Sequence, residues 1–253
     1  MQKKRILLKI GSNTLTKETD HISRGKIEDI GRQIAKLKDG YEFIIVSSGA
    51  IAAAKQFVKL EHNGQEITVK QALASIGQPH LMRIFQENFR ELGLFTSQCL
   101  LSYSDFEREV SKENICNTIN VLVANNFIPI INENDTVATD EIKFGDNDKL
   151  AALTAALMKV DLLIIATNTD GIYTKESFIN KKPETIRLVS NLADLQNEVS
   201  SSKSSHGTGG MESKIEAANI ARQANVETWI VNGLQDNFII DALENKTAFT
   251  TIK

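Results

Sequence analysis

The feature that most constrains this chain is the regular alternation of short aliphatic runs with longer amphipathic segments. The runs are rich in Ile, Leu and Val, and several are apolar at every position, as in IIV at 44–46 and LLII at 162–165. Strands that are apolar on both faces are typical of a sheet with helices on both sides. The seven runs lie at residues 5–10, 43–46, 94–101, 127–131, 162–166, 228–231 and 248–252.

Between the runs, apolar residues recur at the three- and four-residue spacing of helices. Ile27, Ile30 and Ile34 follow Ser23, a residue type suited to cap a helix start. Comparable stripes precede the fourth, fifth and sixth runs and start at Ile115, Leu150 and Ile215. Alternation of strands and helices at this pitch predicts crossover units and parallel strands. We therefore expect an α/β fold of three layers, with an open, mainly parallel sheet between two layers of helices, and one domain over residues 1–253.

Composition argues against several classes of protein. The chain has 29 Lys and Arg against 32 Asp and Glu, and this near-neutral balance is unlike that of a nucleic-acid binder. No apolar stretch approaches the roughly 18 residues of a membrane-spanning helix. The first run, interrupted by Lys9 and ended by Gly11, is too short for a signal peptide. We expect a soluble cytoplasmic protein with no membrane or nucleic-acid partner. Two cysteines, Cys99 and Cys116, cannot build a disulfide framework, and we expect free thiols.

The residues that follow the runs are candidates for function, because ligands of parallel sheets bind beyond the carboxyl ends of the strands. Five such junctions are rich in small or charged residues, at 9–16, 46–54, 132–153, 166–174 and 206–214. The polar stretch 197–210 could be a domain linker, but too few residues follow it to form a second domain. We interpret it as a functional loop on a rigid scaffold.

Two lysines occupy positions that are unfavourable without a partner. Lys9 ends an apolar strand, where a buried charge is costly, and Gly11 and Ser12 follow it. Lys214 lies in the first turn of an expected helix, where a cation opposes the helix dipole. An anion bound between them explains both positions, and neutralising phosphate charge is the main requirement of phosphoryl transfer. The simpler alternative for Lys9 is a strand-edge lysine that reaches solvent.

Several familiar motifs are absent from the polar junctions. Segment 207–214 lacks the G-x4-GK[ST] pattern of a Walker loop, and Glu212 stands where a dinucleotide-binding motif needs its third glycine. SSGA at 47–50 is not a nucleophile elbow; Ser47 or Ser48 could cap a helix, or a hydroxyl and helix amides could bind a carboxylate. The four histidines are scattered, without an HExxH pattern.

The segment 132–148 is the most unusual part of the chain. It gathers Asn132, Glu133, Asn134, Asp135, Asp146, Asn147 and Asp148. Such clusters are commonly solvated loops, and this one does not have the spacing of a calcium-binding loop. Because the cluster follows a buried run and precedes a helical stripe, its carboxylates could instead receive an ammonium group or orient lysines.

Together these segments resemble the amino acid kinase family, and within it the enzymes that phosphorylate glutamate. The resemblance covers nearly the whole chain and rests on KIGSNTL (9–15), VSSGAIAA (46–53), IPIINENDTVAT (128–139), FGDNDKLAAL (144–153), GIYT (171–174) and GTGGMESK (207–214). It implies ATP-dependent phosphorylation of the γ-carboxylate of L-glutamate to γ-glutamyl phosphate, the first step of proline biosynthesis. It also implies Mg²⁺ carried by ATP, with no metal held by the protein, a homo-oligomer (dimer or tetramer), and feedback inhibition by L-proline.

The resemblance further implies roles for individual residues. Lys9, Asp148 and Lys214 would be catalytic, with Asp148 holding both lysines in place. Ser48, Asp135 and Asn147 would bind glutamate, and Asp135 would take its α-ammonium group. The residues expected at ATP are Lys9, Gly11, Ser12, Thr167, Asn168, Thr208, Gly209, Gly210, Met211, Glu212, Ser213 and Lys214.

The sequence departs from the family pattern in two places. The family usually has Thr-Asp where this chain has Thr167-Asn168, so either Asp170 compensates or the contact with the nucleotide is neutral. Many relatives also carry an additional C-terminal domain of the kind found in RNA-modifying enzymes, and we expect this chain to be the form without it.

Three other functions compete with this interpretation. A kinase of the same fold that acts on N-acetylglutamate is disfavoured by Asp135, because an acetylated amine has no charge to pair with. A non-catalytic regulator that binds a nucleotide or an amino acid would be expected to lack Lys9, Asp148 or Lys214, and all three are present. A plain α/β packing domain leaves the five polar junctions unexplained.

Overall fold

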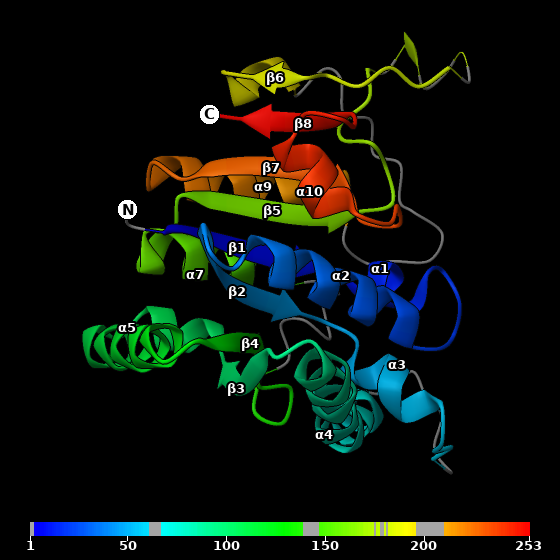
Figure 1. The fold of residues 1–253 in the computed structure, drawn as a ribbon, viewed down its shortest axis with the longest axis vertical. Helices are drawn as coiled ribbons and strands as arrows, with labels where there is room; N and C mark the ends of the chain where they lie inside the picture. Colours follow the sequence, from blue (N-terminus) through cyan, green and yellow to red (C-terminus); the bar gives the residue numbers. More distant parts are fainter. Residues whose placement is uncertain are drawn as a thin grey trace.

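The computed structural model describes residues 3–60, 67–138, 147–174, 176–177, 180, 182–195 and 210–253. The strands of these residues form one eight-stranded sheet in the order β3-β4-β2-β1-β5-β7-β8-β6, which Figure 1 shows as a stack of ribbons. The strands are β1 (Lys4–Ile10), β2 (Tyr41–Ser47), β3 (Phe95–Leu101), β4 (Phe127–Glu133), β5 (Leu162–Thr167), β6 (Leu188–Val189), β7 (Glu227–Asn232) and β8 (Phe249–Ile252).

The connections between the strands are mainly helical. The α-helices are α1 (Ser12–Thr16), α2 (Arg24–Leu37), α3 (Ala50–Lys55), α4 (Ile67–Glu91), α5 (Glu109–Ala124), α7 (Asp148–Met158), α9 (Met211–Gln223) and α10 (Phe238–Leu243). Two short 3₁₀ helices, η1 and η2, span Tyr103–Phe106 and Leu192–Leu195. None of the helices in the described ranges combines the length and the apolarity that a membrane crossing requires.

The predicted parallel sheet is confirmed over most of its width. β1 lies at the centre, paired in parallel with β2 on one side and with β5 on the other. This pairing places Lys9 between Val46 and Ile165, at the carboxyl end of the sheet. β8 is antiparallel to β7 and is the exception among the described pairings.

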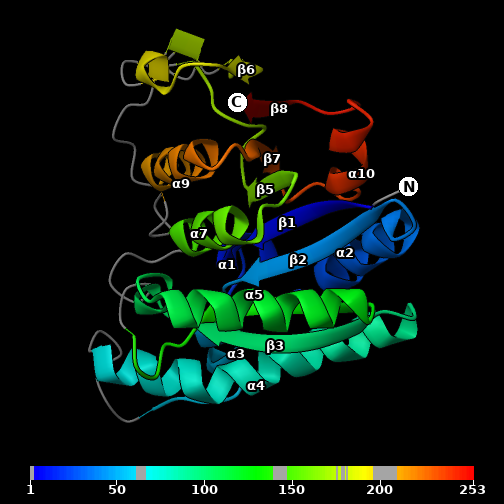
Figure 2. The same ribbon diagram turned by 90° about the vertical axis from the view of Figure 1, so that its left-hand side faces the viewer.

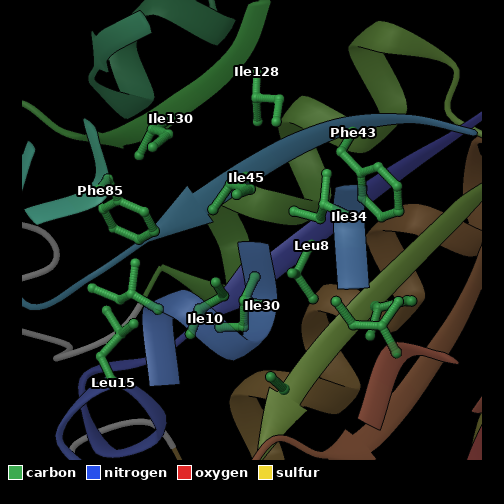
Figure 3. Packing of buried hydrophobic residues seen from close by; sticks show 14 of the residues in the cluster. Leu8, Ile10, Leu15, Ile30, Ile34, Phe43, Ile45, Phe85, Ile128 and Ile130 are labelled. Carbon is green, nitrogen blue, oxygen red and sulfur yellow. The ribbon is translucent and has the colours of Figure 1, made fainter. Parts of the chain in front are cut away.

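Helices cover both faces of the sheet, as the doubly apolar runs predict. Figure 2 shows α7 and α9 on one side of the sheet and α2 and α10 on the other. One hydrophobic cluster joins the strands to α2, α4 and α10, and a second cluster joins them to α5, α7 and α9. Figure 3 shows part of the first cluster, in which Leu8 and Ile10 of β1 lie with Ile30 and Ile34 of α2 and with Phe85 of α4. The three-layer αβα architecture is therefore confirmed.

The boundaries of several elements follow from local signals in the sequence. Each of the seven aliphatic runs forms a strand, with ends shifted by a few residues. α2 begins directly after Ser23, whose hydroxyl accepts a hydrogen bond from the Lys26 amide (3.2 Å). Ser23 is therefore the N-cap that the sequence predicts.

The elements that were not predicted from the sequence include β6 and α4. β6 has only two residues, too few for a periodic pattern. α4 is the longest described helix, but its sequence mixes Gln, Gly, Pro79 and His80 with the apolar residues, so no strong stripe results. Gly77 lies where α4 crosses α3, and a β-carbon there would stand 1.8 Å from the Ala50 carbonyl oxygen. The contact between these two helices therefore requires glycine.

Candidate active site

Those predicted site residues that the structure describes lie near the carboxyl ends of the central strands. In Figure 1 the arrows of β2 and β5 point to the side of the molecule where α1 and α3 lie. α1 starts two residues after the end of β1, and α3 starts shortly after β2. The amino ends of α7 and α9 meet at the same edge, because side chains from their first turns contact each other and Lys9.

Asp148 links the two lysines that the sequence analysis selected. Its carboxylate forms an ion pair with Lys9 at the end of β1 through Oδ1, and a second with Lys214 of α9 through Oδ2 (3.0 Å). The Asp148 side chain is fully buried, and those of Lys9 and Lys214 are 3% and 8% exposed. The alternative of a strand-edge lysine in solvent is therefore wrong for Lys9.

The charge of this group is set by competition between burial and attraction. Burial by itself raises the pKa of the Asp148 carboxyl group, since it removes water from the charged form. The two ammonium groups and their hydrogen bonds outweigh burial and hold that pKa well below its usual range. Asp148 is therefore ionised at neutral pH, and two lysines share one buried carboxylate. This arrangement leaves net positive charge at a sheet edge, which suits an anionic ligand.

The amino end of α9 is attached to the same carboxylate. The Ser213 hydroxyl group lies 2.9 Å from Asp148 Oδ2 and 2.8 Å from the Gly210 carbonyl oxygen. Gly210 is the N-cap of α9 and, as a glycine, provides no capping side chain of its own. Met211 and Glu212 form its first turn, with Glu212 exposed. Thr208 and Gly209 lie outside the described residues.

Gly11 and Ser12 lie directly beside Lys9. Gly11 is the N-cap of α1, and Ser12 is the first residue of this helix. A β-carbon at Gly11 would stand 3.5 Å from the Lys9 ammonium nitrogen, so glycine leaves the space next to this group open. Backbone amides beside a lysine at a strand end fit phosphate oxygens.

Ser48 and Asn147 form a buried polar cluster at the ends of β2 and α7. The side-chain NH₂ group of Asn147 donates to Ser48 Oγ (3.1 Å), to the Ser47 carbonyl oxygen (3.3 Å) and to Asn132 Oδ1 (2.7 Å). The alternative that Ser47 or Ser48 caps α3 is wrong, because the N-cap is Gly49, with φ at +107°. Asn132, which Gln78 of α4 contacts in turn (2.9 Å), is a site neighbour to which the sequence analysis gave no individual role.

Asp135 is a buried carboxyl group just beyond β4. Burial raises its pKa to about 6. Its Oδ1 atom has no hydrogen-bond partner among the described residues, and the same holds for Asn147 Oδ1. Gln71 donates to the Asp135 carbonyl oxygen (3.0 Å) and so attaches this turn to α4. Two buried oxygen acceptors without donors suit a ligand that brings N–H groups.

The turn after β5 holds the residues expected near the nucleotide. Thr167 ends β5 and is buried, whereas Asn168 is exposed and donates to Glu18 (3.1 Å). Asp170 Oδ1 accepts from Asn232 (2.8 Å) and Gln235 (3.1 Å). The Asp170 carboxylate is therefore turned toward the end of β7 and the residues that follow it.

Cys99 and Cys116 are free thiols, as predicted, and burial raises the pKa of both. The His80 ring packs against Phe57 at a tilt of 60°, with 4.9 Å between the ring centroids. Within the part of the chain that the structure describes, no three His, Cys, Asp or Glu side chains are grouped as a metal site requires.

Comparison with known proteins places this fold and sequence in a family. The model of the amino acid kinase family matches residues 4–232. Two solved structures share the fold: UMP kinase from Ureaplasma parvum (TM-score 0.66, 19% identity, covering 100% of both chains) and carbamate kinase from Giardia lamblia bound to AMP-PNP (TM-score 0.68, 15% identity, covering 99% of this chain and 98% of that chain).

Curated relatives at higher identity are glutamate 5-kinases. Those of Neisseria meningitidis serogroup A and Thermoanaerobacter sp. (strain X514) are 38% and 41% identical, over 97% and 98% of this chain and 67% of each relative. That of Clostridium tetani is 40% identical, over 98% of this chain and 93% of the relative. Matches that cover nearly the whole chain agree with the motifs that suggested the family. The chain therefore belongs to the amino acid kinase family and, within it, to the glutamate 5-kinase group.

Proposed function

We propose that this chain transfers the γ-phosphoryl group of ATP to the γ-carboxylate of L-glutamate and so forms γ-glutamyl phosphate, the first step of proline biosynthesis. The observation that carries the proposal is the pairing of Lys9 and Lys214 with one buried carboxylate, Asp148. The relatives at about 40% identity are glutamate 5-kinases, which supports the same reaction.

Lys9 and Lys214 would act on the phosphoryl group. Asp148 holds their ammonium groups together in a site from which water is largely excluded, so both charges are in place before substrate binds. Preorganised positive charge of this kind stabilises the charge on the transferring phosphoryl oxygens. The amides of Gly11, Ser12 and the first turn of α9 would add further donors to the phosphates.

Asp135 and Asn147 would bind the amino end of glutamate. Each presents a buried oxygen that has no donor among the described residues, and an α-ammonium group supplies three N–H donors. Ser48 Oγ, which already accepts from Asn147, keeps its own O–H to donate to a substrate carboxylate. The combination favours a free amino acid over an acylated one.

The chemical step needs no protein base. A γ-carboxylate oxygen of glutamate attacks the γ-phosphorus of ATP, the new O–P bond forms, and the bond to the β–γ bridging oxygen breaks. ADP leaves with that electron pair. A glutamate carboxyl group has an ordinary pKa of about 4.3, so it is already ionised at pH 7. The chain therefore contributes positioning and charge, which are the main requirements of phosphoryl transfer.

The proposal also covers the nucleotide, the assembly and the control of the enzyme. ATP enters as Mg-ATP, with Mg²⁺ as part of the substrate. A homo-oligomer, feedback inhibition by L-proline, a cytoplasmic location and a single kinase domain over residues 1–253 are further parts of the proposal. One continuous eight-stranded sheet supports the single domain.

A hydroxylamine-trapping assay tests the reaction directly. Acyl phosphates react with hydroxylamine to give a hydroxamate that is coloured with iron. The purified chain would be incubated with Mg-ATP and, separately, with glutamate, N-acetylglutamate and aspartate. We expect signal with glutamate alone, and we expect Lys214→Ala to abolish it.

The other outcomes separate the competing functions. Signal only with N-acetylglutamate would keep the chemistry but overturn the role of Asp135. No ATP-dependent signal with any substrate would favour a binding protein without catalysis. Lys36→Ala, which removes an exposed lysine of α2, is the matched control and should retain full activity.

A further inference from the structure

The hydrogen bond between Asn168 and Glu18 joins two segments that border the proposed nucleotide site. Asn168 Nδ2 donates to Glu18 Oε1 at 3.1 Å, across 150 residues of sequence. Glu18 follows α1, the helix that starts beside Lys9, and Asn168 follows β5. The contact therefore joins the end of α1 to the turn 167–170.

The backbone at Glu18 is unusual for the residue that occupies it. Lys17 and Glu18 both have left-handed conformations, with φ at +49° and +61°. Lys17 is the C-cap of α1, and the Glu18 amide bonds to the Asn13 carbonyl oxygen (3.1 Å). Glycine adopts this conformation without the steric cost that a side chain brings. Strained residues cluster at functional sites, which makes the Glu18 side chain a candidate for a role there.

The far side of the turn 167–170 is held independently of Glu18. Asp170 Oδ1 accepts from Asn232 and Gln235, and the Gly233 amide donates to the Thr167 carbonyl oxygen (2.7 Å). Gly171, with φ at +112°, lies so close to Thr250 of β8 that a β-carbon would stand 2.5 Å from the Thr250 hydroxyl oxygen. The Glu18 contact completes the attachment of the turn on the side of α1.

The amide at position 168 is matched to the carboxylate at position 18. An aspartate at 168 would place two carboxylates about 3 Å apart, where like charges repel and the hydrogen bond is lost. The amide at position 168 therefore has an acceptor in Glu18, whereas Asp170 Oδ1 already accepts from Asn232.

We propose that Glu18 and Asn168 form a positioning pair that sets the turn 167–170 for the nucleotide. The inference rests on the proposed function, since it takes this turn as part of the ATP site. It predicts that a change of charge at one position weakens ATP binding unless the other position is changed to match it. Neither residue takes part in the chemical step, so the pair should act on ATP binding and leave turnover and glutamate binding unchanged.

A charge-matched cycle of variants tests the pair. The variants are Asn168→Asp, Glu18→Gln and the double variant, with Glu113→Gln, an exposed carboxylate of α5, as the matched control. We expect Asn168→Asp to raise the KM for ATP by about fivefold, the upper range for an exposed pair. Glu18→Gln keeps an acceptor and should stay within twofold of the unmodified chain. The double variant should regain the KM of the unmodified chain, because the amide introduced at position 18 can donate to the carboxylate introduced at position 168.

Three results would overturn the proposal. One is a KM for ATP that falls on Asn168→Asp alone, which would show that the nucleotide needs a carboxylate at 168. Another is a double variant whose KM for ATP is as high as that of Asn168→Asp. The third is a KM for glutamate that changes as much as the KM for ATP in Asn168→Asp. The dissociation constant of ATP, measured by calorimetry, separates failure of this pair from failure of the glutamate kinase function, because it does not depend on the acceptor.

Two further variants test the strain at Glu18. Glu18→Gly and Glu18→Ala both remove the carboxylate, but only glycine relieves the left-handed backbone. We expect the glycine variant to melt about 2 °C above the alanine variant. Both should raise the KM for ATP by about threefold, as loss of an exposed hydrogen bond predicts. An unchanged KM for ATP in both would leave Glu18 without a positioning role and contradict the proposal.

Discussion

Lys214 contacts the carboxylate of Asp148 through a 3.0 Å ion pair that joins the first turn of α9 to the first residue of α7. The two residues are 66 positions apart. Their contact brings together the amino ends of two helices, each of which carries a partial positive charge. A buried carboxylate stabilises both ends, and Lys9 completes the group from β1.

Replacement of the shared carboxylate should therefore disturb both stability and catalysis. Asp148→Asn would leave Lys9 and Lys214 buried without their counter-charge, and breaking a buried ion pair costs about 3–5 kcal/mol. We expect the free energy of unfolding in urea to fall by about 3 kcal/mol and kcat to fall at least about 100-fold, the loss typical of a displaced charge-stabilising group.

The exposed carboxylate Asp20 provides the control for this substitution. Asp20→Asn should leave both quantities within the error of measurement. Retention of full kcat in Asp148→Asn would remove Asp148 from the catalytic machinery, whatever happened to stability.

Asp135 should give glutamate binding a distinctive pH dependence. Its pKa is raised to about 6 by burial, so the carboxyl group becomes neutral as pH falls through 6 and loses its attraction for an ammonium group. We expect the KM for glutamate to rise as pH is lowered from 7 to 5, whereas the KM in Asp135→Asn should be high and flat. The γ-carboxyl group of the substrate titrates near 4.3 and does not interfere above pH 5. An identical pH profile in both proteins would contradict the assignment.

The same raised pKa predicts that ionisation of Asp135 lowers the stability of the fold, although ionisation favours glutamate binding. The Asp135 carboxyl group has a higher pKa in the folded chain than its ordinary value of 3.8, so its ionised form destabilises the fold. This cost is absent well below pH 3.8, grows between about pH 4 and pH 6, and is fully present above about pH 7. Asp135→Asn should therefore be more stable than the unmodified chain in urea at pH 8, and the difference should shrink steadily as the pH is lowered toward 4.

Asn147 is surrounded by acceptors, which makes its amide group essential. In Asn147→Asp the isosteric carboxylate would face the Ser47 carbonyl oxygen and Asn132 Oδ1 with no N–H group to offer. Because a buried charge that faces two acceptor oxygens is costly, we expect a loss of about 2–4 kcal/mol in urea unfolding and a large rise in the KM for glutamate. Asn117→Asp, an exposed change on α5, should have little effect on either.

Two glycines provide a matched test of helix packing. In Gly77→Ala a β-carbon would overlap the Ala50 carbonyl oxygen, so α3 and α4 would have to separate, at a cost of about 3 kcal/mol or more. Gly25 of α2 has no neighbour within 4 Å of the corresponding position. Gly25→Ala should stabilise the chain by up to about 1 kcal/mol through helix propensity. Thermal melts that show equal effects would contradict the close approach of α3 and α4.

The sequence alone determined the architecture of the sheet because its signal is local and repeated. The aliphatic runs are short, and several of them, such as 44–46 and 162–165, are apolar on both faces. This combination has few solutions other than a strand between two layers of helices. The antiparallel pairing of β8 had no such signal. Nor did α4, in which polar residues interrupt the apolar spacing.

Part of the candidate site could also be predicted from the sequence. Lys9 and Lys214 stood out because each is unfavourable in its own element, and Asp148 stood out in an acidic cluster at a helix start. Their meeting followed from the rule that parallel strands bring their carboxyl ends to one edge. The family motifs then supplied the roles of Ser48, Asp135 and Asn147.

Only the tertiary structure decided which polar groups satisfy one another. Asn132 and Asn147 meet through their side chains, Asp170 accepts a hydrogen bond from Asn232 at the end of β7, and Glu18 contacts Asn168 across 150 residues. These contacts have no sequence period, because each depends on the distance and direction of two side chains brought together by the completed sheet. A pattern of residue types fixes where strands and helices form, whereas hydrogen-bond partners are set by the three-dimensional position of single atoms.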